Sequence, residues 1–516
     1  MSSATRTGTA HDVGAPVEQL APIPDRVLTF LSDGVKPLFI DGEWVDSASG
    51  ETFESVNPST GEVLVRVAAG GVADVDRAVT AARRALDGPW SRMTPAQRQA
   101  VMWRLADALV DHAEELRFLE VLDMGSPIGP NPRTRVETCA EVLRYFAGAA
   151  TKIHGETIPN SIGSDIFSYT VREPIGVVAA VVPWNGPISN ALWKIAPVLA
   201  TGCTMVLKPA EQAPLVAVKL AEIMQEVGIP DGVVNVVNGF GESAGAALVN
   251  HPGVDKVCFT GSTATGQSIV RASAGNLKRV TLELGGKSPD IVFADADLDR
   301  AFPAAAMGAF WNSGQACIAG SRVYVERPIY EQAIESISRF AAELKVGNSL
   351  DPTTQIGPLV SADQLDRVTG YMRIGREEGA QLAVGGHRMT VGKLESGYFV
   401  APTVLSHVRD HMRVAREEIF GPVMCVLPFD DVEEVLTRAN DTVFGLGSGV
   451  WTRDLGRAHR VIRRLQAGTV WVNTYLLGDP AVPFGGYKMS GWGRENGLAA
   501  LEGYLNTKSV YIDSQP

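Results

Sequence analysis

Two side chains in this sequence have the chemistry of a nucleophile and a base, and the first is Cys317. It lies within residues 312–320 (NSGQACIAG), where small and polar neighbours suit an accessible loop or the start of a helix. A cysteine taken alone is more often a small buried hydrophobe. A reactive thiolate also needs positive potential or backbone N–H groups around it, which a sequence does not show. Cys317 is therefore a candidate nucleophile with a competing structural interpretation.

The candidate base is Glu283, at the end of a predicted strand over residues 279–284. Strand alternation places Thr281 and Glu283 on one face of this strand. A lone glutamate in a strand is usually solvated, but we expect this strand to be central in a parallel sheet that is covered on both faces. A carboxylate at its C-terminal edge, entering Gly285-Gly286, is placed to be a base with a raised pKa.

Two glycine-containing loops could bind a diphosphate. Residues 259–266 (FTGSTATG) follow one predicted strand and open a helix, so that backbone N–H groups near Gly261 and Ser262 can meet phosphate oxygens. This loop is neither the GxGxxG fingerprint nor a P-loop. Residues 239–244 (GFGESA) fit the looser fingerprint that ends in alanine, and they also follow a strand. Spacing alone does not choose between the two loops.

Lys208 and Glu211 follow the predicted strand at 204–207. A lysine near a nucleotide can bind ribose hydroxyls or a phosphate. A glutamate there can accept hydrogen bonds from both ribose hydroxyls and would repel a 2′-phosphate. An ordinary exposed ion pair is an equally good interpretation of the two residues.

The elements that must position these side chains alternate between strand and helix from residue 177 onward. Strands predicted at 177–182, 204–207, 233–237, 256–260 and 279–284, with helical stretches such as 214–227 between them, imply right-handed crossovers and a parallel sheet. Ligands bind such sheets at the carboxyl ends of the strands. A second α/β unit begins after residue 288 with a strand at 291–293, a helix at 298–311 and a strand at 322–325, and runs to about residue 487.

The flanking segments are less regular. Residues 1–29 are predicted to be a flexible arm, followed by a hairpin at 38–45 and by helices at 72–86 and at 94 to about 122. Residues 154–174 form an extended excursion, and a late strand at 508–512 has no local partner. A late strand of this kind often pairs with the sheet edge of another subunit.

Composition limits the class of protein. A chain of 516 residues predicts two or more domains, and 46 Lys+Arg against 58 Asp+Glu give a net charge of −12, which argues against a nucleic-acid binder. No apolar run approaches the roughly 18–20 residues that span a bilayer, and the N-terminus lacks a secretory h-region. The five cysteines contain no CxxC pair, and no metal site is predicted. We expect a cytoplasmic, metal-free protein.

These pieces occur together with further motifs, and the combination resembles the aldehyde dehydrogenase superfamily. The resemblance covers the chain from about residue 37 to the C-terminus, with the motifs in the family's order and at its spacing. The matching motifs are Pro183-Trp184-Asn185, Lys208-Pro209-Ala210-Glu211, Phe259-Thr260-Gly261-Ser262, Leu282-Glu283-Leu284-Gly285-Gly286-Lys287, Gly314-Gln315-Ala316-Cys317, Glu418-Ile419-Phe420-Gly421-Pro422 and Pro483-Phe484-Gly485-Gly486-Tyr487-Lys488.

The resemblance implies an α/β fold of two open, Rossmann-like domains with parallel sheets and a small extended oligomerisation arm. The dinucleotide-binding domain would comprise residues 30–153 and 175–285, and the catalytic domain residues 286–487. The arm would comprise residues 154–174 and 488–516 and reach across a homodimer or within a homotetramer.

The resemblance also implies the catalytic roles. Cys317 would attack the aldehyde carbonyl to give a thiohemiacetal, with the amide of Asn185 and the backbone N–H of Cys317 holding the oxyanion. Hydride transfer to the nicotinamide would leave a thioester, and Glu283 would activate the water that hydrolyses it.

By resemblance the cofactor is NAD, with NADP disfavoured by Glu211. Lys208 and Glu211 would hold the adenosine ribose and Glu418 the nicotinamide ribose. The resemblance favours the Gly261 loop over the Gly239 loop for the diphosphate. The implied cofactor-binding residues are Pro183, Trp184, Lys208, Glu211, Gly261, Ser262, Leu284, Glu418 and Phe420.

The substrate pocket is expected to be wide. In many relatives an aromatic residue follows the oxyanion asparagine and another precedes the Pro-Phe-Gly-Gly motif, whereas this chain has Gly186 and Gly478 there. Trp193 keeps its place on the helix, and Ile318 adjoins the nucleophile. Loss of two rings, each burying roughly 150–250 Å² when packed, predicts room for bulky or aromatic aldehydes. The alternative is that loops around Leu476 and Leu477 refill the space.

Three other functions compete with this one. An acylating, coenzyme A-dependent dehydrogenase is the nearest, and the presence of Glu283 argues for the hydrolytic reaction instead. A cysteine hydrolase would pair Cys317 with a histidine, and no histidine lies near either motif. A non-enzymatic scaffold on the same fold would be expected to have lost Cys317, Glu283 or Asn185.

Overall fold

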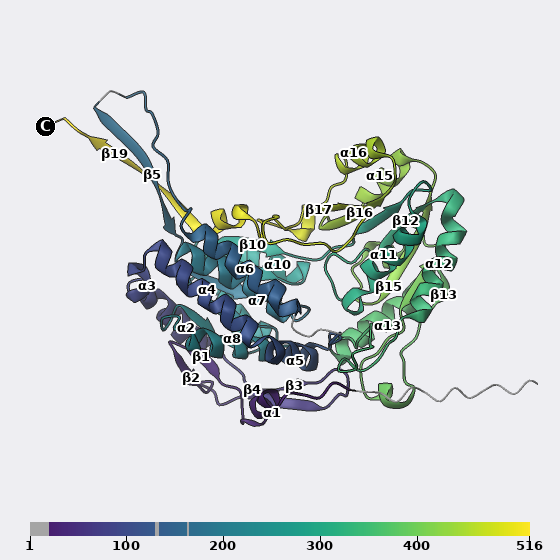
Figure 1. Ribbon diagram of the computed structural model, residues 1–516, viewed down its shortest axis with the longest axis horizontal. Coiled ribbons are helices and arrows are strands. Elements are labelled where there is room, and N and C mark those ends of the chain that lie inside the picture. The colour runs from purple at the N-terminus through teal and green to yellow at the C-terminus, as the bar shows by residue number, and fades with distance from the viewer. Residues whose placement is uncertain (1–19, 130–133, 163–164, 516) are drawn as a thin grey trace, which may run out of the picture.

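The computed structural model describes residues 20–129, 134–162 and 165–515 (Figure 1). Most of the predicted N-terminal arm, residues 1–19, lies outside the described residues. The prediction of a flexible arm is wrong for its last part, because α1 (Asp25–Ser32) is a helix. Val27 and Phe30, three residues apart on one helical face, are both buried in the hydrophobic core of the protein.

The first α/β unit is built on an eight-stranded sheet. The five strands β6 to β10 run parallel, and β1 adds antiparallel to β8. The predicted hairpin at 38–45 is present as β1 and β2, which join its far edge. The sheet order is β18 (Gly491–Trp492), β10 (Arg279–Glu283), β9 (Lys256–Thr260), β6 (Val177–Val181), β7 (Thr204–Lys208), β8 (Val234–Val236), β1 (Leu38–Ile40) and β2 (Glu43–Val45).

Both faces of this sheet are covered by helices. Val178 and Ala180 of β6 pack into one core, while their neighbours Val177 and Ala179 pack into another. This alternation explains why the strand reads as a continuous apolar run. The first core is shared with α4 (Pro95–Asp111), α5 (Ala113–Met124), α6 (Thr134–Ala150), α7 (Pro187–Thr201) and α8 (Leu215–Glu226), and the second with α2 (Val72–Ala85), α9 (Ala246–Asn250) and α10 (Thr263–Ser273).

The single helix expected from residue 94 to about 122 is two helices. His112 leaves helical geometry at φ −92° and ψ 13°, between α4 and α5. Its ring lies 3.1 Å from a carboxylate oxygen of Glu115 and 3.0 Å from one of Glu226 on α8. The apolar period continues across this break, which is why periodicity alone does not reveal it.

The second α/β unit has a seven-stranded sheet that is parallel except for β13. One face packs against α11 (Leu298–Phe310) and α12 (Tyr330–Glu343), and the other against α13 (Ala362–Glu377), α15 (Val432–Asn440) and α16 (Leu455–Ile462). The order is β13 (Gln381–Val384), β14 (Thr403–Ser406), β15 (Val423–Phe429), β12 (Arg322–Glu326), β11 (Pro289–Val292), β16 (Gly447–Trp451) and β17 (Thr469–Val472).

After the second unit, the chain returns to the first. Residues 491–492, part of the predicted arm, pair instead with Leu282 and Glu283 of β10. The expectation that β10 is central is therefore wrong: it is the last parallel strand, and β18 covers its outer edge.

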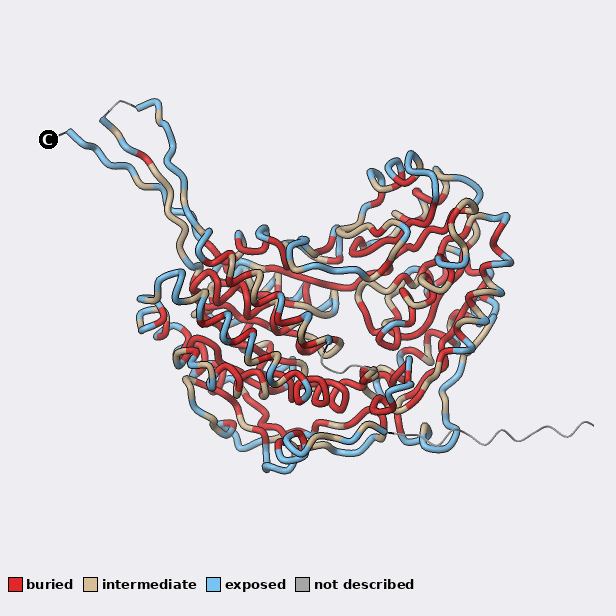
Figure 2. Tube along the Cα trace, in the orientation of Figure 1, coloured by how far each residue is buried: buried red, intermediate tan, exposed pale blue. Residues whose placement is uncertain are grey.

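The two extended segments predicted to lack a local partner pair with each other. β5 (Ile166–Pro174) and β19 (Leu505–Asp513) form an antiparallel ribbon over nine residue pairs. The ribbon projects from the body of the protein (Figure 1), and most of its length is exposed or half-buried (Figure 2). The fold class predicted from the sequence, two open α/β units with an extended arm, is confirmed. Among the described residues, no helix combines the length and apolarity needed to cross a membrane.

Candidate active site

Cys317 follows α11 through a tight turn in which the backbone takes unusual conformations. Asn312, Ser313 and Gly314 have φ values of 54°, 58° and 68°. A Cβ on Gly314 would lie 2.1 Å from the carbonyl oxygen of Gly421, so only glycine fits this approach. The turn presents the half-buried thiol of Cys317 at the end of a rigid helix.

The surroundings of Cys317 disfavour the thiolate form of its side chain. Burial, together with the nearby carboxyls of Glu418 and Glu283, raises the pKa of Cys317 to about 12, although the backbone N–H groups of Cys317 and Ile318 oppose the shift. A base or a bound positive charge is therefore required to form the thiolate.

Asn185 is tied to the turn that carries the thiol. Its Nδ2 donates a hydrogen bond to the carbonyl oxygen of Gln315 at 2.9 Å. Asn312 Nδ2 in turn donates to the carbonyl oxygen of Asn185 at 3.0 Å. These bonds join the loop after β6 to the loop after α11, so the amide of Asn185 and the thiol of Cys317 are held in one site.

Glu283 ends β10 and is only 3% exposed. Neither carboxylate oxygen has a hydrogen-bond partner in the part of the chain that the structure describes. Burial first, and the carboxyl of Glu495 second, raise the pKa of Glu283 well above its usual value, while Lys194 and Arg494 act against the shift. A buried, unpaired carboxyl of this kind can take up and release a proton.

Lys194 and Glu495 form a buried ion pair beside Glu283, which the sequence analysis did not identify. The Lys194 ammonium also donates to Thr260 Oγ1 at 2.8 Å. The available signal was a lysine inside the apolar run of α7 (ALWKIAPVLAT), since a charge there needs a buried partner. Glu495 could not have been matched to it, because the two residues are 301 positions apart.

The predicted ribose pair is present at the end of β7. Lys208 Nζ donates to Glu211 Oε2 at 3.0 Å. Burial lowers the pKa of Lys208, and the carboxylate of Glu211 opposes that shift. The Lys208 side chain is buried, whereas the Glu211 side chain is 30% exposed. The two residues are therefore not an ordinary surface ion pair.

Both glycine loops lie at the carboxyl ends of parallel strands of the first sheet. Ser262 caps α10, and its Oγ accepts a hydrogen bond from the Thr265 N–H at 3.2 Å. The Gly239 loop follows β8 and enters a π-helical turn at Gly241–Gly245. Strands β6 and β7 separate the two loops. The Gly261 loop is the one beside β10, and the Gly261 N–H donates to the carbonyl oxygen of Glu283 at 3.0 Å.

Glu418 and Phe420 reach the same site from the second unit. The carboxylate of Glu418 accepts the Gly286 N–H at 3.0 Å, and burial raises the pKa of Glu418 to about 7. The ring of Phe420 meets that of Trp184 edge-on, with centroids 5.3 Å apart. Pro183 precedes Trp184, and Leu284 is buried beside α10, with its N–H donating to Ser490.

Two of the predicted pocket residues, Trp193 and Ile318, contact aromatic side chains from later in the chain. Trp193 packs against Phe484, with ring centroids 5.4 Å apart, and Ile318 accepts a hydrogen bond from Tyr475 Oη at 3.0 Å. A Cβ on Gly478 would meet no atom within 4 Å, and Leu477 is 67% exposed. Leu477 therefore points to solvent, whereas Leu476, the other residue of the alternative, is half-buried.

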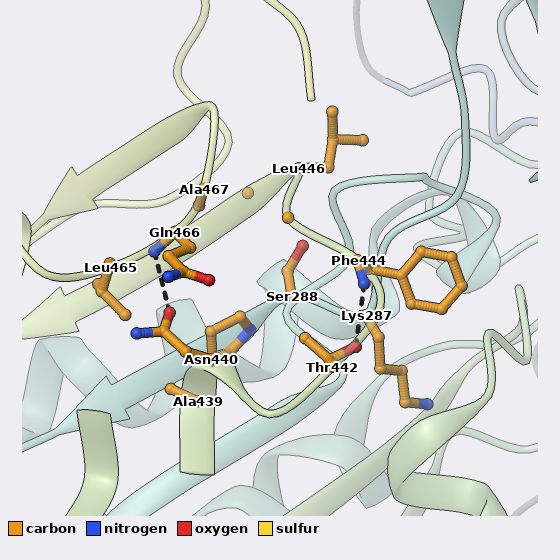
Figure 3. Close-up of a pocket in the computed structure, with 13 residues that line it drawn as sticks. Lys287, Ser288, Ala439, Asn440, Thr442, Phe444, Leu446, Leu465, Gln466 and Ala467 are labelled. Atoms are coloured by element: carbon orange, nitrogen blue, oxygen red, sulfur yellow. Dashed lines mark hydrogen bonds between the residues drawn. The ribbon is translucent and has the colours of Figure 1, made fainter. Parts of the chain in front are cut away.

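A small pocket is lined by residues that follow the Gly285-Gly286 motif and by residues of the second unit (Figure 3). Figure 3 shows the Lys287 side chain directed away from Ser288, and burial lowers the pKa of Lys287 to about 8. The pocket contains none of the predicted catalytic residues. It is lined by Lys287, Ser288, Pro289, Ala439, Asn440, Thr442, Phe444, Gly445, Leu446, Gly447, Leu465, Gln466 and Ala467.

The fold and this site define an α/β enzyme. Its first unit has a parallel sheet of the kind that binds nucleotides at the carboxyl ends of its strands. The second unit brings a cysteine thiol to those strand ends. The model of the aldehyde dehydrogenase family matches residues 44–510. The chain belongs to the aldehyde dehydrogenase family.

Known relatives agree along nearly the whole chain. An aldehyde dehydrogenase of Enchytraeus buchholzi is 48% identical over 493 residues, which cover 95% of this chain and 98% of that protein. The NAD+ complex of an aldehyde dehydrogenase from Bacillus cereus has a TM-score of 0.93 at 48% identity, covering 96% of this chain and all of that one. A mutant of the P. syringae AldA indole-3-acetaldehyde dehydrogenase in complex with NAD+ and IAA has a TM-score of 0.90 at 45% identity, covering 93% and 96%.

Proposed function

We propose that this enzyme oxidises an aldehyde to the carboxylic acid with NAD, through a thioester on Cys317. The observation that carries the proposal is the Cys317 thiol within electrostatic reach of Glu283, whose buried carboxyl has no hydrogen-bond partner among the described residues. A nucleophile near a general base that is not engaged in a hydrogen bond is what a two-stage acyl transfer needs.

In the first stage the thiol releases its proton to water, and the thiolate attacks the carbonyl carbon, forming a C–S bond while the C=O bond opens to an alkoxide. The alkoxide that develops is held by the second N–H of the Asn185 amide and by the backbone N–H of Cys317. NAD supplies the hydride acceptor that turns this adduct into a thioester. In the second stage Glu283 takes a proton from water, which attacks the thioester, and the proton returns to the sulfur as the acid leaves.

The residues present fit a dinucleotide. Lys208 and Glu211 place a donor and an acceptor 3.0 Å apart, which matches two neighbouring ribose hydroxyls. The half-exposed carboxylate of Glu211 would repel a 2′-phosphate, which favours NAD over NADP. Gly261 and Ser262 open α10, whose N-terminal N–H groups suit the diphosphate. Glu418, Phe420, Trp184, Pro183 and Leu284 would hold the nicotinamide end.

The test is NADH formation by the purified enzyme with NAD and a panel of aldehydes, without coenzyme A. We expect turnover, and we expect Cys317→Ala to abolish it while NAD binding is retained. Turnover that begins only when coenzyme A is added would replace the hydrolytic reaction by the acylating one. NAD binding without turnover of any aldehyde would contradict the proposal.

The glycines at 186 and 478 support a pocket for bulky or aromatic aldehydes. The complex of the P. syringae relative with IAA is consistent with such substrates in this family. A higher kcat/KM for benzaldehyde than for acetaldehyde is expected, and a strong preference for acetaldehyde would contradict the wide pocket. We further propose that the enzyme is cytoplasmic and homo-oligomeric, dimer or tetramer.

A further inference from the structure

Arg135 lies between the two segments that carry the amide of Asn185 and the thiol of Cys317. It belongs to the first turn of α6. Its Nη2 lies 3.7 Å from the position that a Cβ on Gly186 would occupy. Its guanidinium carbon lies 5.8 Å from the ring centre of Trp311, the first residue of the turn that leads to Cys317. Arg135 was not among the residues predicted for the site.

Among the residues that the structure describes, the ion-paired groups at Arg135 carry more positive than negative charge. Glu120 is fully buried and is shared by two guanidinium groups, at 2.6 Å from Arg117 Nη1 and 3.3 Å from Arg135 Nε. These three groups sum to one positive charge. Arg117 is buried, whereas the side chain of Arg135 keeps 25% of its exposure. The excess charge is therefore accessible at Arg135, since the buried carboxylate is already bonded to Arg117.

The surroundings of Gly186 are polar rather than aromatic. A Cβ there would lie 2.9 Å from Ser189 Oγ and 3.2 Å from Asn190 Nδ2, as well as beside Arg135. Both of these side chains donate to the carbonyl oxygen of Gly186, at 3.1 and 3.0 Å. A Cβ at this position would fit only if the Ser189 and Asn190 side chains shifted. Glycine leaves the guanidinium uncovered by residue 186.

We propose that Arg135 binds an anionic group, in the first place a carboxylate, on the end of the aldehyde remote from the carbonyl. The enzyme then prefers aldehydes that also carry a negative charge, such as oxo acids and carboxyl-substituted aromatic aldehydes. The inference rests on the proposed aldehyde oxidation and names the substrate class of the same site. Guanidinium groups bind carboxylates through two parallel N–H bonds, and the cation–π contact with Trp311 favours this position of the group.

The test compares each acid with its uncharged methyl ester: 4-carboxybenzaldehyde with methyl 4-formylbenzoate, and a series of linear oxo acids with their esters. For the best acid of the set we expect kcat/KM about tenfold above that of its ester, which corresponds to about 1.4 kcal/mol. The difference is expected in KM, and it should shrink as ionic strength rises, because Arg135 is partly exposed. In Arg135→Met the ratio should fall to about one.

Arg144→Met is the matched control. Arg144 lies on the same helix, over the ring of Trp103 at 5.7 Å, and pairs with Asp107 at 2.8 Å and Glu141 at 2.6 Å. Its loss should leave the acid-to-ester ratio unchanged. A wild-type ratio of one or below, an unchanged ratio in Arg135→Met, or an equal loss for acid and ester in that variant would each overturn the proposal. Absence of turnover with every aldehyde would instead contradict the proposed function on which it rests.

Discussion

At the residue scale, Cys317 and Glu283 share one environment that disfavours charge on both. Burial raises the pKa of Cys317 to about 12 and that of Glu283 well above its usual value. Cys317 becomes a nucleophile, and Glu283 a base, only after each has lost its proton.

The first prediction follows from the raised pKa of Glu283. Only the ionised carboxyl accepts a proton from water, and the ionised fraction increases as pH rises through its pKa. We therefore expect kcat to increase with pH, with a midpoint above the ordinary glutamate value of 4.5. This increase of kcat with pH should disappear in Glu283→Gln, because the amide side chain does not ionise. A wild-type midpoint at the ordinary value would contradict the role assigned to burial.

Glu211→Gln tests the choice of cofactor. The amide keeps a hydrogen-bond acceptor for the ribose but removes the charge that repels a 2′-phosphate, and Lys208 remains to pair with that phosphate. We expect the ratio of kcat/KM for NAD over NADP to fall about tenfold, or about 1.4 kcal/mol. Steady-state kinetics with both cofactors measure it. A ratio that stays at the wild-type value would show that Glu211 does not discriminate.

Candidate site residues that lie in sequence motifs could be predicted from the sequence. Their neighbours in the folded protein could not. Cys317, Glu283 and Asn185 lie in short motifs, so their types and spacing could be read directly. Lys194, Glu495 and Arg135 have no motif. Their importance comes from contacts across long sequence separations, such as the 301 positions between Lys194 and Glu495, which no local pattern contains.

At the element scale, the turn between α11 and Cys317 depends on a left-handed glycine. In Gly314→Ala, the methyl group would meet the Gly421 carbonyl at 2.1 Å at a φ of 68°. We expect loss of most activity and destabilisation by about 1–3 kcal/mol. Thermal unfolding and NADH formation measure the two effects.

Gly370→Ala is the control for that variant. Gly370 lies inside α13, and a Cβ there meets no atom within 4 Å. Alanine favours the helix over glycine by about 1 kcal/mol, so stability should be equal or slightly higher. Equal unfolding temperatures for Gly314→Ala and the wild type would contradict the strained turn.

The elements were predicted better than their order. The strand at 256–260 was placed at its observed bounds, because a short apolar run between turn residues is a clear local signal. The helix break at His112 and the sheet edge at β10 were missed. Both are decided by tertiary contacts, namely the bonds of His112 to Glu226 and the pairing of β18 with β10.

At the scale of the whole molecule, the ribbon of β5 and β19 extends away from both sheets and exposes apolar side chains. Tyr511 is 63% exposed, Ile512 46% and Phe167 50%. An exposed apolar ribbon that ends in open strand edges is suited to pair with a second copy of the chain. This is the physical basis of the predicted homo-oligomer.

The assembly prediction is tested with Tyr511→Glu and Ile512→Glu together. We expect the wild-type mass, by light scattering after size exclusion, to be two or four times the chain mass of 55.0 kDa. The double variant should shift to smaller species. Val391→Glu, at a site 81% exposed and away from the ribbon, should not change the mass. A monomeric wild type would contradict the role of the ribbon.

The central claim, an acyl group carried on Cys317, is tested most directly by the mass of Glu283→Gln after mixing with NAD and benzaldehyde, without coenzyme A. The amide cannot activate water, so the thioester should accumulate. The account predicts a gain of one benzoyl group per chain, located on the peptide that contains Cys317 and dependent on NAD. No adduct, an adduct on another cysteine, or one that forms without NAD would contradict it.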